Sequence, residues 1–75
     1  MKPVAEWNLR PREREAIEAV IESGSNKGAA RILGVSVKTI DVYLTEAIRK
    51  SEAGSFSSGR LHMLLAYDRS TRGNA

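Results

Sequence analysis

The stretch that decides the fold runs from Ser25 to Arg49 and reads SNKGAARILGVSVKTIDVYLTEAIR. Ala30 is a small residue where two helices must approach closely, and Gly34 follows four residues later, at a turn that requires a positive φ. Val35 fills the space beneath the turn, and Ser36 offers a side-chain oxygen that can cap the next helix. Together these residues predict a helix-turn-helix.

Two further helices are expected around this motif. Pro11 suits the first position of a helix, and Ile17, Val20 and Ile21 then recur at helical spacing. No segment alternates between apolar and polar residues as a strand would. The sequence therefore predicts an all-α, four-helix domain with helices over residues 11–22, 26–33, 37–50 and 58–68.

A chain of 75 residues allows one small domain. We expect residues 1–8 to form a loosely held arm that docks through Trp7, and residues 9–69 to form the domain itself. The composition of residues 51–59 is that of a loop, and residues 70–75 are expected to be a disordered tail.

Composition excludes several classes of function. The chain has no Cys and a single His62, so we expect no disulfide, no metal site, no cofactor and no catalytic site. No apolar run approaches the roughly 18 residues that span a bilayer, and the start of the chain does not resemble a signal peptide. We therefore expect a cytoplasmic protein that is not an enzyme.

The charge distribution favours nucleic acid. The net charge is +3, and residues 23–50 carry five basic and two acidic groups, so the excess falls on the helix-turn-helix. An ordinary solvated surface is the alternative interpretation.

The helix over 37–50 has two different faces. Ile40, Leu44 and Ala47 share the arc expected to face the core. In a helix-turn-helix the opposite arc enters the major groove of DNA. The residues predicted to contact DNA are Lys38, Thr39, Asp41, Val42, Thr45 and Arg49, with Lys27, Arg31 and Lys50 as phosphate contacts.

These side chains suit base edges. Lys38 and Arg49 can reach guanine or a phosphate, Val42 suits a thymine methyl group, and Thr45 can donate or accept. Asp41 weakens attraction to phosphates, although an aspartate can accept a hydrogen bond from cytosine N4.

Residues 9–50 resemble the DNA-binding domain of LuxR-type (GerE-like) transcriptional regulators. The resemblance rests on four motifs: PRERE at 11–15, GSNK at 24–27, AxxLGVS at 30–36 and KTI at 38–40. The promoter-reading C-terminal domain of sigma factors is similar over the same stretch. The resemblance implies a four-helix domain whose third helix reads DNA and whose fourth often forms a homodimer interface.

The chain departs from the LuxR-type pattern at four positions. It has Arg10 where Thr or Ser is usual, which implies a weaker cap, and Gly28 where Glu is frequent. It has Tyr43 in place of His and Asp41 in place of Lys, so the reading face exchanges a positive group for a negative one. With no sensor domain before the motif, we expect a stand-alone module like the small regulators of phages or mobile elements.

The fourth helix carries more apolar residues than one face requires. Leu61, Leu64 and Leu65 share one arc and are expected to face the helices over 11–22 and 37–50, which leaves Met63 and Tyr67 as a second, exposed stripe. That stripe predicts a homodimer face that also includes Arg60 and Ala66. The alternative is that Met63 and Tyr67 cover the arm or the loop.

The sequence thus predicts a dimeric, sequence-specific regulator that binds double-stranded DNA. The rival hypothesis is a protein-interaction module of the same fold that binds another regulator or RNA polymerase. Asp41, Glu46 and the modest net charge favour this rival.

Overall fold

The computed structural model describes residues 1–55 and 58–72. Its elements, in chain order, are a 3₁₀-helix η1 (Val4–Glu6), α1 (Pro11–Ser23), α2 (Asn26–Leu33), α3 (Val37–Ser51), a second 3₁₀-helix η2 (Ala53–Ser55) and α4 (Gly59–Arg72). The described residues contain no strand, so the all-α prediction is confirmed.

The C-terminal helix is longer than predicted. It runs to Arg72 rather than ending at 68, so residues 70–72 are helical and not a disordered tail. Residues 73–75 of that expected tail, and residues 56–57 of the expected loop, lie outside the described residues.

The turn between α2 and α3 is built as the sequence predicts. The side-chain oxygen of Ser25 caps α2 by accepting from the Gly28 backbone N–H at 3.0 Å, and that of Ser36 caps α3 by accepting from the Thr39 N–H at 3.0 Å. Gly34 ends α2 at φ +69°, in the left-handed region that favours glycine. These local contacts fix where both helices begin and end.

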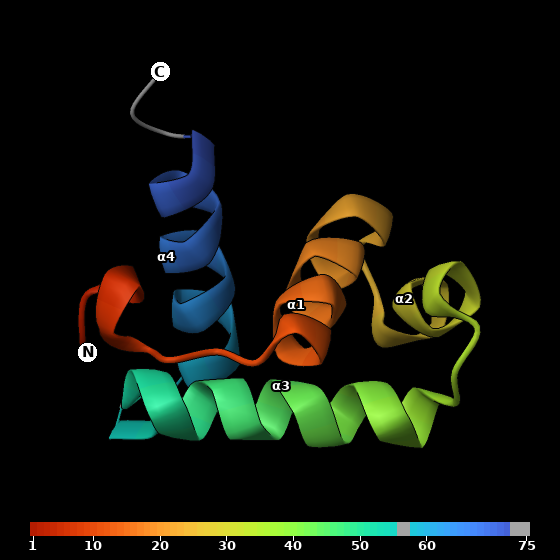
Figure 1. Ribbon diagram of the computed structural model, residues 1–75, viewed down its shortest axis with the longest axis horizontal. Helices are drawn as coiled ribbons and strands as arrows, with labels where there is room; N and C mark the ends of the chain where they lie inside the picture. Colours follow the sequence, from red (N-terminus) through yellow and green to blue (C-terminus); the bar gives the residue numbers. More distant parts are fainter. Residues whose placement is uncertain (56–57, 73–75) are drawn as a thin grey trace.

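Three helices pack against one side of α3. Figure 1 shows α3 along one edge of the molecule, with α1, α2 and α4 all on the same side of it. The buried apolar residues of the first three helices are Ala16, Ile17, Ala19, Val20, Ala29, Ala30, Ile40, Leu44 and Ala47. The outward side of α3 is therefore left without a helix against it.

The N-terminal arm is firmly docked. The Trp7 ring is buried and stacks on Tyr67 of α4, with the ring centroids 6.4 Å apart. The indole N–H donates to the Lys2 carbonyl at 2.8 Å, and the Lys2 backbone N–H donates to the Ser51 carbonyl at the end of α3 at 2.9 Å. Trp7 docks as predicted, but the expectation of a loosely held arm is wrong.

The buried face of α4 differs from the predicted one, and of the three leucines expected to face the core only Leu64 is half-buried. Met63 and Tyr67 are 0% and 4% exposed, whereas Leu61 and Leu65 are 55% and 50% exposed. The prediction that Met63 and Tyr67 form an exposed dimer stripe is therefore wrong, because η1 and η2 both pack against α4 and Trp7 covers Tyr67. The alternative, that this stripe meets the arm, is confirmed.

Candidate nucleic-acid interface

The outer face of α3 is the side of this helix that points away from the core. Ile40, Leu44 and Ala47 are buried on the inner side, as predicted. Val42, by contrast, is 53% exposed. The exposed residues that define the outer face of α3 are Lys38, Asp41, Val42, Thr45 and Arg49.

Thr39 lies at the flank of this face. It is half-buried, and its hydroxyl lies 2.9 Å from the Ser36 hydroxyl in a hydrogen bond. Its first role is thus within the cap of α3.

Charges on the outer face are only partly balanced. Arg49 forms an ion pair with Glu46 one turn earlier, although the Arg49 side chain remains 70% exposed. Lys38 and Asp41 form no ion pair within the part of the chain that the structure describes. The start of the helix thus presents a cation and an anion to solvent, and its end presents a paired arginine.

Two further cations lie on α2. Lys27 and Arg31 are exposed, and both line a pocket of 380 Å³ at the start of α2 together with Ser25. Backbone N–H groups at a helix start favour anions, so these cations lie where a phosphate would be attracted.

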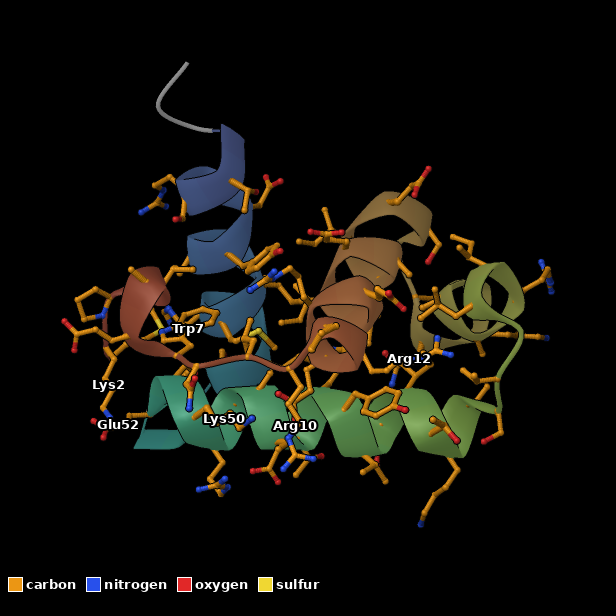
Figure 2. All side chains as sticks on the ribbon, viewed as in Figure 1. Lys2, Trp7, Arg10, Arg12, Lys50 and Glu52 are labelled. Carbon is orange, nitrogen blue, oxygen red and sulfur yellow. The ribbon has the colours of Figure 1, made fainter. Side chains whose placement is uncertain are left out.

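Lys50 lies elsewhere than predicted. Its ammonium nitrogen is 2.7 Å from Oε1 of Glu13 and 3.3 Å from the Asn8 carbonyl, and the two charged side chains are only 16% and 6% exposed. Figure 2 shows Lys50 beside the arm. The ammonium is held in this mostly buried pair, so Lys50 is not among the exposed cations.

Glu13 is the site residue that sequence reasoning missed. Its Oε1 also accepts from the Arg10 backbone N–H at 2.9 Å, which caps the start of α1. Burial raises the pKa of Glu13, but the hydrogen bonds from Lys50 and Arg10, with their positive charges, outweigh burial and lower it. A glutamate three residues after the residue that precedes a helix is a known capping signal, and it was available in PRERE.

A groove runs between the start of α1 and the outer face of α3. Its volume is about 620 Å³. In Figure 2, Arg10 and Arg12 lie on the side of α1 that approaches α3. Its lining includes Arg10, Arg12, Val42, Tyr43, Glu46 and Arg49.

Other kinds of site are not found in residues 1–55 and 58–72. No three His, Cys, Asp or Glu side chains there are grouped so that they could hold a metal ion. No helix in the same residues combines the length and apolar character needed to cross a bilayer.

Known proteins are similar to this chain over its helix-turn-helix region. Residues 8–50, which contain α1, α2 and nearly all of α3, match the family model "Sigma-70, region 4". The chain is also 42% identical over 50 residues to the transcriptional regulatory protein FixJ of Bradyrhizobium diazoefficiens. That alignment covers 67% of this chain and 24% of FixJ, so the chain spans about a quarter of that relative. No solved structure matches this chain.

Proposed function

Since the chain belongs to the sigma-70 region 4 family and is a helix-turn-helix DNA-binding domain of the LuxR type, we propose that it is a sequence-specific transcription regulator. The outer face of α3 enters the major groove of double-stranded DNA. The observation that carries this proposal is that no helix covers the outer side of α3 (Figure 1), where Val42 and several polar residues are exposed.

Each residue of the face has a distinct part in the proposal. Lys38 contacts a phosphate or guanine, and Val42 meets a thymine methyl group. Thr45 donates to or accepts from a base edge, and Arg49, held by Glu46, reaches guanine or a phosphate. Asp41 selects cytosine by accepting from its N4 amino group.

Phosphate contacts outside α3 orient the domain on the duplex. Lys27 and Arg31 on α2 supply them, and Thr39 adds a contact at the flank of the reading helix. Phosphate contacts of this kind fix register and carry no sequence information.

Fluorescence anisotropy with labelled duplexes tests the proposal. The affinity should fall steeply as salt rises from about 50 mM, because bound phosphates release counterions. Lys38→Gln and Arg49→Gln should each weaken binding by about 1–3 kcal/mol if they contact a base. Arg14→Gln, which changes an exposed arginine of α1 that lies away from the outer face of α3, is the matched control and should bind like the parent. A parent that binds no duplex in a random pool contradicts the proposal.

A homodimer through the outer side of α4 extends the proposal. Leu61 and Leu65 are half exposed and four residues apart, so they form an apolar stripe, with Arg60 and Ala66 beside it. A two-fold contact there would place two reading helices on two half-sites.

Sedimentation equilibrium decides between the dimer and its rival. The parent should dimerise, and Leu61→Glu with Leu65→Glu should leave a folded monomer that binds DNA more weakly. A parent that stays monomeric at high concentration excludes the dimer. The stripe then favours the rival function, binding of another regulator or of RNA polymerase.

A further inference from the structure

The groove between α1 and α3 shares one wall with the outer face of α3. Val42, Glu46 and Arg49 line the groove, and Val42 and Arg49 also belong to the outer face. The opposite wall comes from the start of α1, where Arg10 and Arg12 lie. A duplex seated on the outer face of α3 must therefore run past this groove.

The groove holds one arginine that is not neutralised by an ion pair. Lys50 pairs with Glu13, Arg49 pairs with Glu46, and Arg12 pairs with Glu15 at 3.2 Å. Arg10 is exposed, and its guanidinium forms no ion pair within residues 1–55 and 58–72. Its backbone N–H is held by Glu13, so the base of this side chain is fixed beside the groove.

We propose that this groove is a second DNA-contact site, in which Arg10 binds a backbone phosphate next to the stretch that α3 reads. The inference rests on the proposed function and deepens it. A major groove is bounded by two sugar-phosphate strands, so a helix inserted in it has phosphates on both flanks. The charge of Arg10 acts on Glu13 without forming an ion pair, so its guanidinium donors can still reach phosphate oxygens.

The salt dependence of binding separates this contact from a merely structural role. Each phosphate contact adds about 0.9 to the slope of log K against log salt. Arg10→Gln should lower the magnitude of this slope by about that amount. It should also reduce the affinity for random and for selected duplexes by the same factor. Arg10→Lys keeps the charge and should keep the slope. Arg14→Gln is the matched control, because Arg14 lies on the same helix, is exposed and lines a different pocket.

The outcomes distinguish this inference from the function on which it rests. If Arg10→Gln keeps the parent's salt slope while Lys38→Gln binds more weakly under the same conditions, the groove is not a DNA-contact site. The proposal for the outer face of α3 is then unaffected. A parent that binds no duplex overturns both. If Arg10→Gln loses binding to polyglutamate but not to duplex, the groove receives an acidic protein segment, and the phosphate contact is wrong.

Discussion

Glu13 joins the start of α1 to the end of α3. One carboxylate oxygen accepts from the Arg10 backbone N–H and from the Lys50 ammonium, two groups that lie far apart in the sequence. The Glu13–Lys50 pair is nearly buried and links α1 to α3 where the two helices pack together. One ionised side chain outside the proposed reading helix therefore adds a polar link to the apolar packing that holds α3.

Acid should weaken the fold through this residue. The pKa of Glu13 is lowered in the folded state, so its ionised form stabilises the fold above the unfolded pKa of about 4.3. This contribution is lost as pH falls through the lower, folded pKa. Urea unfolding of the parent at pH 7 and at pH 3 should show the loss.

Substitution of Glu13, compared with substitution of the exposed Glu15, measures how much the buried pair contributes to stability. Glu13→Gln should lower the free energy of unfolding at pH 7 by roughly 3–5 kcal/mol, because Lys50 is left without its counter-charge. The free energy of unfolding of this variant should also change less than the parent's between pH 7 and pH 3. Glu15→Gln breaks an exposed pair with Arg12 and should cost about 0.5 kcal/mol or less. Equal effects of the two substitutions would show that the Glu13 pair is not structural.

Glu52 is a second residue whose substitution should change the stability of the fold. It follows α3 at φ +61°, in the left-handed region where non-glycine residues lose about 1–2 kcal/mol. Its ion pair with Lys2 is long, at 3.6 Å, and exposed. Glu52→Gly should therefore raise the melting temperature, whereas Asn8→Gly should change it less, since asparagine tolerates φ +56°. A lower melting temperature for Glu52→Gly would mean that the contacts of the glutamate outweigh the backbone strain.

At the scale of elements, the helix-turn-helix could be predicted and α4 could not. Ser25, Gly34 and Ser36 act on groups within a few residues, so their sequence order is sufficient to place α2 and α3. The buried face of α4 meets η2, α3, α1 and the arm, and most of these elements lie far from α4 in the sequence. Because both sides of α4 are apolar, periodicity alone had no means of selecting Met63 over Leu61.

Alanine substitutions measure which side of α4 is in the core. Met63 has no exposed surface, so Met63→Ala should lower the free energy of unfolding by about 2–5 kcal/mol. Leu65→Ala removes a half-exposed side chain and should cost less than about 1 kcal/mol when measured on dilute protein. A larger loss of stability for Leu65→Ala than for Met63→Ala would show that Leu65, and not Met63, faces the core.

At the scale of the molecule, one side of α3 packs in the core and the other side is exposed. The outer-face residues Lys38, Val42 and Thr45 could be predicted from helical spacing, because the core arc fixes the opposite arc. The burial of Lys50 could not be predicted in this way, because its partner Glu13 lies 37 residues away in the sequence. The groove was also missed, since it exists only when α1 has docked on α3.

The central claim is that DNA meets the outer face of α3. Titrating isotope-labelled protein with duplex DNA, and following backbone amides by nuclear magnetic resonance, tests it directly at each residue. We expect the largest chemical-shift changes at Lys38, Asp41, Val42 and Thr45, and at Arg10 in the groove, while Leu61 to Leu65 on α4 change little. Shifts concentrated on α4, with the outer face of α3 unaffected, would contradict it.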